Sequence, residues 1–391
     1  MACPEQNNEY NKFRLQSLFM IYDVNLSTRT FIGVRDKMLH QASAFSRVFS
    51  TVKLICLDLS TLVCMTFRNG LLVDTENLMS DVKVGRFYLS VELILERFLS
   101  SNPVFYIRFS PMVNMGLPLC INRISKTESK LFLEVPTFPY DQELNDEERD
   151  LDSKYRDMIH SKADIIFSPS VPKGGDKIFG SRLIKILNGV DSRIFKTALP
   201  VFNAATFGII AIGWLSPWHG FDRIISGLRD FKKSIKNVDI HLHVVGDGPY
   251  ASTLKDYVQK EDSQSLVTLW GVLQGKQLDE LFSQCQLGVD SLAWHRVNVY
   301  EAETLKGREY IARGLPLIQG YKNSSVQLES PGLIQVPADD SPIDLVTVYQ
   351  QVKKYFSHGG PSIHREFAEK NYNWENIAKQ QFYQAFVHLS A

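Results

Sequence analysis

Short apolar runs alternate with amphipathic helical stretches along the first half of the chain. Residues 15–22 (LQSLFMIY) are almost all apolar and large, as expected of a buried parallel strand. A loop that ends at Gly33 follows, and residues 34–49 then repeat apolar side chains at helical spacing. Further strands are predicted at 52–57, 104–107, 131–136, 163–168 and 181–191, with a helix at 89–101. This alternation predicts an α/β fold with a parallel sheet.

The pattern of strands and helices begins again after an irregular stretch at residues 192–206, which contains Pro200. A chain of 391 residues exceeds one comfortable hydrophobic core, so two domains of about 200 residues are the natural division. The second set of strands is predicted at 207–213, 241–245, 266–270 and 286–290. We therefore expect an N-terminal domain at 1–198, a C-terminal domain at 199–372 and a terminal helix at 373–391.

Charge and cysteine content narrow the classes of function. Basic and acidic residues each total 43, so no nucleic-acid partner is expected, because binding to a phosphate backbone requires an excess of basic residues. The five cysteines form no CxxC pair, which favours free thiols in a reducing cytosol over disulfides or a zinc site: Cys3, Cys56, Cys64, Cys120 and Cys285. Signal-peptide and transmembrane patterns are not found. We expect a cytoplasmic protein, and peripheral contact with the inner face of the plasma membrane stays open.

The stretch from Val289 to Gly314 concentrates charged side chains at the start of a helix. A strand leads into a loop that carries His295, Arg296 and Glu301, and the helix begins near Thr304 with Lys306 in its first turn. The first N–H groups of a helix lack internal partners, and the helix dipole adds partial positive charge there. Such a helix start suits a phosphorylated ligand, and the Thr304 hydroxyl is suited to cap it.

The segment LKGREYIARGLPLI, which begins at Leu305, resembles the donor site of GT-B glycosyltransferases of family 4, the group 1 enzymes. In that family two glutamates flank seven residues, as Glu301 and Glu309 do here. The resemblance implies that Glu309 bonds the nucleotide ribose, that Glu301 reaches the donor sugar, and that the helix start at Thr304 and Leu305 holds the diphosphate. Glu303 lies in the same loop and is an alternative to Glu301, and a solvated helix face is the alternative for the pair.

Other segments are similar to further parts of the same family. The turn at Gly246 and Gly248 resembles the family's GxGP turn near the nucleotide, and Val272 corresponds to backbone that flanks the nucleobase. Gly33 is the candidate for the glycine loop that faces the donor phosphates, although it also fits an ordinary loop. The last helix resembles the one that crosses back onto the first domain in GT-B proteins.

One segment departs from the family pattern. In the stretch WLSPWHGFDR, which starts at Trp214, the family has an arginine and a lysine that neutralise the leaving diphosphate. Trp214 and His219 occupy those positions here. Positive charge would then have to come from His219 if it is protonated, from Arg223, or from Lys306 and Arg296.

Two charged residues close predicted strands of the first domain. Arg108 and Glu134 each end an apolar run, and the carboxyl ends of strands border the ligand crevice of an open α/β sheet. We assign Arg108 to the acceptor side and Glu134 to proton handling, with strand ends capped in water as the alternative. Asp150 and Asp152 mimic a metal-binding DxD, but they lie in a predicted solvated helix, so no metal site is expected.

The resemblance implies an α/β GT-B fold in which two Rossmann-like domains face a cleft. It also implies a retaining, metal-independent glycosyltransferase with no cofactor, which moves a sugar from a nucleotide-sugar to a saccharide or lipid-linked acceptor in polysaccharide or glycoconjugate biosynthesis. Two alternatives remain open. One is a non-catalytic GT-B subunit that binds a partner transferase or an acceptor, and the other is a nucleotide-sugar 2-epimerase.

Overall fold

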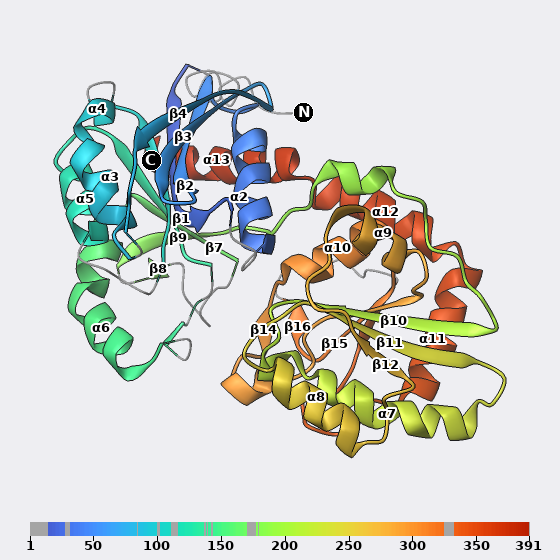
Figure 1. The fold of residues 1–391 in the computed structure, drawn as a ribbon. Coiled ribbons are helices and arrows are strands. Elements are labelled where there is room, and N and C mark those ends of the chain that lie inside the picture. Colours follow the sequence, from blue (N-terminus) through green and yellow to red (C-terminus); the bar gives the residue numbers. More distant parts are fainter. Residues whose placement is uncertain are drawn as a thin grey trace. The chain divides into compact units, whose positions relative to one another are not determined.

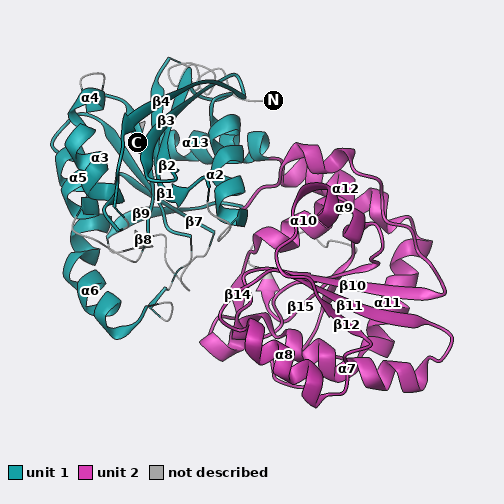
Figure 2. Ribbon diagram, in the orientation of Figure 1, with its two compact units in different colours: residues 1–187, 374–391 teal, residues 188–373 magenta. Residues whose placement is uncertain are grey.

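The computed structural model of the protein describes residues 15–27, 32–83, 85–99, 102–110, 116–136, 138, 140–141, 144–169, 177–178, 180–323 and 332–390. The chain divides into two compact units (Figure 2). Unit 1 comprises residues 1–187 and 374–391, and unit 2 comprises residues 188–373. The last helix therefore returns to the first unit, as the family resemblance implies.

The described residues of unit 1 form a nine-stranded sheet. Strand β1 pairs in parallel with β2 and β5, and parallel pairing continues through β6 and β7 to β9. The order across the sheet is β4 (Leu71–Met79), β3 (Thr61–Arg68), β2 (Thr51–Asp58), β1 (Ser17–Asn25), β5 (Val104–Arg108), β6 (Lys130–Glu134), β7 (Ile165–Ser168), β9 (Ser181–Lys185) and β8 (Lys177–Ile178).

Helices cover both faces of this sheet and create two hydrophobic cores. On one face, α2 (Ile32–Phe45) packs beside α13 (Trp374–Ser390) (Figure 1). Their apolar side chains share a hydrophobic core with Met20 of β1. The neighbouring residue Phe19 enters the core on the other face. Because successive residues of β1 enter opposite cores, its sequence is apolar without alternation. The helices of the second face are α3 (Phe87–Ile94), α4 (Glu96–Leu99), α5 (Gly116–Ile124) and α6 (Asp146–Ser161).

An antiparallel hairpin, β3–β4, extends the sheet beyond β2, and the sequence analysis does not include it. The two strands are joined by Asn69 and Gly70, whose φ angles are 49° and 84°. Asn-Gly with positive φ at both positions is the strongest sequence signal for a two-residue hairpin turn. The hairpin was therefore detectable, although a search for alternating strands and helices passes over it.

The described residues of unit 2 form a six-stranded sheet in which every pairing is parallel. The order is β12 (Val267–Leu269), β11 (Asp239–Val245), β10 (Thr206–Ile212), β13 (Leu287–Val289), β15 (Leu317–Gln319) and β17 (Leu333–Gln335). Strand β10 has β11 on one side and β13 on the other, so the direction of winding reverses between β10 and β13. In such sheets, ligands bind at the carboxyl ends of the strands beside this switch point.

Two groups of helices flank the sheet of unit 2 (Figure 1). Helices α7 (Phe221–Ser234), α8 (Ala251–Lys260) and α11 (Leu345–Ser357) share one core with the sheet. Helix α10 (Leu305–Arg313) packs on β13, β15 and α12 (Gly360–Asn371), and α9 (Gly275–Phe282) lies nearby. A short pair, β14 (Glu301–Ala302) and β16 (Lys322–Asn323), precedes and follows α10.

The boundary between the units lies at 187/188, earlier than the predicted 198/199. The 3-10 helix η2 (Ser192–Lys196) packs on α10 and α12, and Arg365 of α12 donates to the carbonyls of Phe195 and Thr197 at 3.3 and 2.6 Å. Hydrogen bonds to distant residues hold this part of residues 192–206 in place. Such bonds produce no periodic pattern in the local sequence, so the sequence does not assign the stretch to unit 2.

The structure also bears on the expectations for Gly33, for the cysteines and for membrane-spanning helices. Gly33 was expected to end a loop before the helix, but it lies in the first turn of α2. Cys56, Cys64, Cys120 and Cys285 are free and buried, and burial raises the pKa of the Cys56 thiol to about 12. Cys3 lies outside the described residues. Among those residues, no helix is both long and apolar enough to span a bilayer.

Candidate functional site

Thr304 begins helix α10 beside the switch point of unit 2. Its hydroxyl accepts a hydrogen bond from the Gly307 amide at 3.0 Å, so Thr304 is the predicted N-cap. The same hydroxyl donates to Oδ2 of Asp290, 2.6 Å away, at the carboxyl end of β13. The helix start is therefore fixed to the end of a central strand.

Asp290 anchors this arrangement from a fully buried position. Its Oδ2 also accepts from the hydroxyl of Tyr321 at 2.7 Å, and its Oδ1 accepts from the amide of Ser291 at 2.7 Å. A Cβ on Gly307 would lie 2.4 Å from Oδ2 of Asp290, so any larger residue would displace the helix start. The sequence analysis did not single out Asp290 or Tyr321. A charged residue after a buried strand was the available signal for Asp290.

Lys306 presents an ammonium group that has no hydrogen-bond partner. Its side chain is 10% exposed, and Nζ lies 3.8 Å from Oδ1 of Asp290 and 5.2 Å from the ring centre of Phe221. Burial lowers the pKa of Lys306 to about 8, although the Asp290 carboxylate acts in the opposite direction. A buried ammonium has three donors to satisfy, so this group is suited to an anionic ligand at the helix start.

His219 is buried at 9% exposure and lies against Gly213, which follows β10. A Cβ on Gly213 would be 3.0 Å from Cε1 of the imidazole. Burial, and then the charge of Lys306, hold the pKa of His219 well below its usual value. His219 is therefore neutral at pH 7, so it does not supply the positive charge that a protonated His219 would bring to the diphosphate.

The two predicted arginines are engaged in ion pairs and carbonyl contacts. Arg296 donates to Asp222 at 2.7 Å and to Asp340 at 2.8 Å, and these hydrogen bonds, first that to Asp222, raise its pKa. Arg223 is 1% exposed and donates to the carbonyls of Leu292 and Ser341 at 2.5 and 2.8 Å. Both side chains hold loops together. Of the four predicted cations, all within the described residues, Lys306 is the one with an unsatisfied charged group.

Glycine turns bring the loops after β10 and β11 into backbone contact. Gly213 and Gly246 have φ angles of 156° and 132°, and a Cβ on Gly246 would lie 1.8 Å from the carbonyl oxygen of Gly213. A Cβ on Gly248 would lie 2.5 Å from the carbonyl oxygen of Leu215. Only glycine permits this approach, so the predicted GxG turn has a structural reason.

The structure separates the three glutamates around α10. Glu301 is exposed in β14, whereas the side chain of Glu303 is fully buried and pairs with Arg308 at 2.9 Å. Arg308 in turn lies 3.8 Å from the ring centre of Tyr372. Glu303 is therefore committed to a buried ion pair, and this favours Glu301 for contact with a ligand.

Glu309 lies one turn into α10 and accepts from Nε of Arg313 at 2.9 Å. Its side chain is 24% exposed, so its carboxylate is accessible to a ligand that displaces Arg313. Leu305 is half-buried in the first turn of α10, and Val272, after β12, is 41% exposed. These positions keep the predicted nucleotide residues accessible on unit 2.

Glu134 of unit 1 is enclosed, which differs from the expected strand end that points into a crevice. Its carboxylate is 0% exposed and accepts from Lys37 at 2.7 Å and from Arg108 at 3.2 Å. Burial alone would raise the pKa of Glu134, but Lys37 and Arg108 outweigh burial and lower it to about 2. Arg108 keeps 18% exposure, so it alone of the predicted pair can reach a ligand.

The two aspartates of the DxD mimic are separated in α6. Asp150 is exposed, whereas Asp152 is buried and accepts from Arg156 at 2.6 Å and from Tyr140 at 3.3 Å. A carboxylate in this buried ion pair is not presented to a ligand. Within the described residues, no group of three or more histidine, cysteine or acidic side chains is arranged to hold a metal ion.

Residues 201–325 match the protein-family model described as "Glycosyl transferases group 1". No curated protein sequence matches the chain. Among solved structures, the chain is similar to a sucrose-phosphate synthase from Thermosynechococcus elongatus, with 15% identity and a TM-score of 0.64 over 96% of this chain and 99% of that one. It is also similar to Anabaena HepE in complex with UDP, with 12% identity and a TM-score of 0.64 over 94% and 99%.

A third similar structure is the catalytic domain of Starch Synthase IV from Arabidopsis thaliana bound to ADP and acarbose. The identity is 12% and the TM-score is 0.63, over 96% of this chain and 100% of that domain. At such identities the comparison establishes the fold, which is the GT-B fold of glycosyltransferases. The predicted fold class and the resemblance to group 1 glycosyltransferases are both confirmed.

Proposed function

We propose that the protein is a retaining glycosyltransferase, because residues 201–325 match the model of group 1 glycosyltransferases and the chain has the GT-B fold. Its donor is a nucleotide-sugar, and its acceptor is a saccharide or a lipid-linked saccharide of polysaccharide or glycoconjugate biosynthesis. The UDP in HepE and the ADP in the starch synthase support a nucleoside diphosphate as the leaving group.

The observation that carries this proposal is the unsatisfied ammonium of Lys306 at the start of α10. Negative charge grows on the diphosphate as the glycosidic bond breaks. Fixed donors aimed at such charge contribute about 2.7 to 4 kcal/mol each at comparable oxyanion sites. The free amides of α10 and the Lys306 ammonium supply these donors, so the reaction proceeds without a metal ion.

Two carboxylates have distinct parts in donor binding. Glu309 releases Arg313 and accepts from the ribose hydroxyls of the nucleotide. Glu301, which is exposed in β14, accepts from hydroxyls of the donor sugar. The sugar develops positive charge in the transition state, so a carboxylate is the appropriate neighbour for it. Gly246, Gly248 and Val272 line the nucleotide with backbone.

On the acceptor side, Arg108 of unit 1 contacts the acceptor, while Glu134 orients Arg108 through their 3.2 Å ion pair. Proton handling, which the sequence analysis assigned to Glu134, is withdrawn, because a fully buried carboxylate with a pKa of about 2 cannot act as a base for an external hydroxyl. The proposal includes a cytoplasmic setting, with peripheral contact at the membrane where a lipid-linked acceptor is presented.

Calorimetry with a panel of UDP-, GDP-, ADP- and dTDP-sugars tests the donor site. We expect one member of the panel to bind the wild type, and Glu309→Ala to weaken that binding by about tenfold or more, because a hydrogen bond to a charged group contributes about 1.5 to 3 kcal/mol. Glu366→Ala, on helix α12, is a matched control and should leave binding unchanged. If no member of the panel binds, the proposed donor site is wrong.

A non-catalytic GT-B subunit is the second candidate, because Trp214 and neutral His219 stand where the family has two cations. Such a subunit would bind a partner transferase or an acceptor without breaking the donor. Slow hydrolysis of the bound nucleotide-sugar by the purified chain, followed by chromatography of the nucleotide, would count against it. The same chromatogram detects an epimerised sugar, the product expected of a 2-epimerase.

A further inference from the structure

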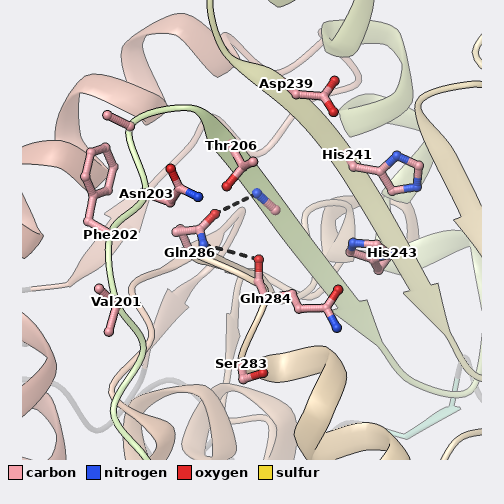
Figure 3. Close-up of a pocket in the computed structure, with 12 residues that line it drawn as sticks. Val201, Phe202, Asn203, Thr206, Asp239, His241, His243, Ser283, Gln284 and Gln286 are labelled. Carbon is pink, nitrogen blue, oxygen red and sulfur yellow. Dashed lines mark hydrogen bonds between the residues drawn. The ribbon is translucent and has the colours of Figure 1, made fainter.

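A pocket of about 680 Å³ lies on unit 2 away from the donor site. It borders the amino-terminal halves of β10 and β11, residues 201–204 and residues 283–286 (Figure 3). The donor site lies at the carboxyl ends of the same strands. Gly208 in the pocket and Gly213 at the donor site are separated by roughly 16 Å of extended chain at 3.3 Å per residue.

Strand β11 supplies the polar wall of the pocket by alternation. Ile240, Leu242 and Val244 enter the core under α7 and α8. Asp239, His241 and His243 therefore project from the opposite face, and all three line the pocket (Figure 3). The floor is held by Gln286, whose Oε1 accepts from the Gly208 amide at 2.7 Å and whose Nε2 donates to the Gln284 carbonyl at 3.2 Å.

His243 presents a fixed hydrogen-bond donor. Its Nδ1 accepts from the indole N–H of Trp270 at 3.1 Å, so the neutral ring must carry its proton on Nε2. Burial, and then the neighbouring His241, lower the pKa of His243 to about 4, so the ring is neutral at pH 7. Asn203 is also fixed as a donor, because its Oδ1 accepts from the Ala205 amide at 2.9 Å and its NH₂ group remains for a ligand.

Acceptor groups line the same pocket: Asp239 lies on the β11 wall with His243, and Ser283 and Gln284 lie at the other end of the pocket. The Asp239 carboxylate carries the only formal charge among the lining residues when both histidines are neutral, and Ser283 and Gln284 add uncharged oxygens. Lys232 lies 3.7 Å from Oδ1 of Asp239 but is not among the lining residues, so a phosphate or nucleotide would meet the carboxylate inside the pocket and is disfavoured. An apolar ligand would leave the polar lining unsatisfied. Within the described residues the histidine pair also lacks a third metal ligand.

We propose that this pocket is a second, neutral saccharide site. Sugar hydroxyls both donate and accept, which matches a lining in which the donors His243 and Asn203 alternate with the carboxylate of Asp239 and uncharged oxygens. Trp270 is not a lining residue, but its hydrogen bond fixes the orientation of the His243 ring.

The role of this site rests on the proposed function. A glycan acceptor or product held on unit 2 outside the donor site would stay tethered during transfer, so the effective concentration of its reactive end would rise without a new contact at the donor site. The site therefore deepens the proposal by selecting an extended, uncharged glycan as the substrate class.

Calorimetry with neutral hexasaccharides of the malto-, cello- and chito- series tests this inference on the full chain. We expect the wild type to bind at least one series, and His243→Phe to weaken binding by about tenfold, because it keeps the ring and removes the Nε2 donor. Asn203→Asp should have a similar effect, since it keeps the acceptor for Ala205 and removes the NH₂ donor. His358→Phe, at the exposed end of α11, is the matched control.

Nucleotide-sugar titrations of the same samples separate the two proposals. Retained donor binding in His243→Phe and Asn203→Asp, with saccharide binding lost, supports a distinct site. Saccharide binding that is unchanged in both variants, or not detected in the wild type, overturns the second site and leaves the proposed function standing. If the wild type binds a saccharide but no member of the donor panel, the proposed function is wrong and the second saccharide site still stands.

Discussion

Two buried carboxylates differ in their surroundings: Glu134, the last residue of the parallel strand β6 in unit 1, and Asp290, which directly follows the parallel strand β13 in unit 2. Each is 0% exposed. Glu134 accepts hydrogen bonds at 2.5 to 3.2 Å from five side chains: Tyr106, Lys37, Gln41, Tyr22 and Arg108. Asp290 also has a lysine neighbour, but the Lys306 ammonium stays 3.8 Å away and makes no hydrogen bond.

The difference shows what each cluster is for. A buried charge is tolerated when its partners satisfy it, and Glu134 has enough partners to hold its pKa at about 2. Lys306 is charged, buried and unsatisfied, and its pKa falls to about 8. The first cluster is complete without a ligand and stabilises unit 1. The second cluster lacks an acceptor, which a diphosphate would provide.

The largest expected effect is on stability and comes from removing the charge of Glu134, the centre of the satisfied cluster in unit 1. Glu134→Gln should destabilise unit 1 by about 3 to 5 kcal/mol, because it removes the carboxylate that pairs with the buried Lys37 ammonium at 2.7 Å. Denaturant-dependent hydrogen exchange measures it, since peptides from β1, β5 and β6 report on unit 1 separately from unit 2.

The effect of Glu134→Gln also has a definite pH dependence. The folded-state pKa of Glu134 lies below its unfolded value, so its contribution is present above the unfolded pKa of 4.5 and is lost as the pH falls toward 2. The variant and the wild type should therefore converge in acid. Equal stability of the two at pH 7 would show that the cluster does not stabilise unit 1.

The next largest effect is on turnover and comes from removing the unsatisfied Lys306 ammonium beside Asp290. Lys306→Met should lower turnover by about 100-fold or more, because it removes a fixed positive donor from the leaving diphosphate. Stability should fall by less than in Glu134→Gln, because Lys306 makes no hydrogen bond and Asp290 keeps those from Thr304, Tyr321 and the Ser291 amide. Steady-state kinetics and thermal unfolding measure the two quantities.

Lys276→Met is the matched control for Lys306→Met. Lys276 is also the second residue of its helix, α9, but its side chain is 90% exposed. It should leave both turnover and stability unchanged. A large loss of stability in Lys306→Met, with turnover preserved, would make Lys306 a structural residue like Lys37 and remove the contrast between the clusters.

A smaller effect is expected from pH. Lys306 has a pKa of about 8 in the free protein, and a bound diphosphate would raise that value. Above pH 8, binding must therefore take up a proton, so donor affinity should fall by up to tenfold per pH unit, while it stays constant below pH 7. Calorimetry from pH 6.5 to 9.5 in two buffers of different ionisation enthalpy measures the slope and the proton uptake. The slope should vanish in Lys306→Met.

Local sequence patterns predicted those parts that local chemistry determines. The apolar runs located the parallel strands, Thr304 was recognised as an N-cap, and the spacing of Glu301 and Glu309 located the helix of the candidate donor site. Each of these depends on residues within one or two turns of chain. The Asn69-Gly70 turn is an equally local signal, but it belongs to an antiparallel hairpin and not to the alternation of parallel strands and helices.

Residues whose state depends on distant partners could not be predicted in this way. Glu134 was expected at a crevice, but it is enclosed by Lys37, which lies 97 positions away in the sequence. Arg296 was expected to be a ligand cation, but Asp222, 74 positions away, engages it. The protonation of His219 depends on burial, which a loop sequence does not report. The sequence therefore identified residue types, and packing decided which charges are available.

The smallest effect, at Thr304, tests whether the α10 start is built as rigidly as the complete cluster of unit 1. Thr304→Ala removes the cap of Gly307 and a donor to Asp290, and should cost about 1 kcal/mol, within the 0.5 to 2 kcal/mol of other cap deletions. Thr304→Ser keeps the hydroxyl and should cost less than half of that. Hydrogen exchange of α10 and β13 measures both variants. If serine and alanine destabilise equally, the hydroxyl does not fix the helix start, and the positions of its amides and of Lys306 must depend on packing instead.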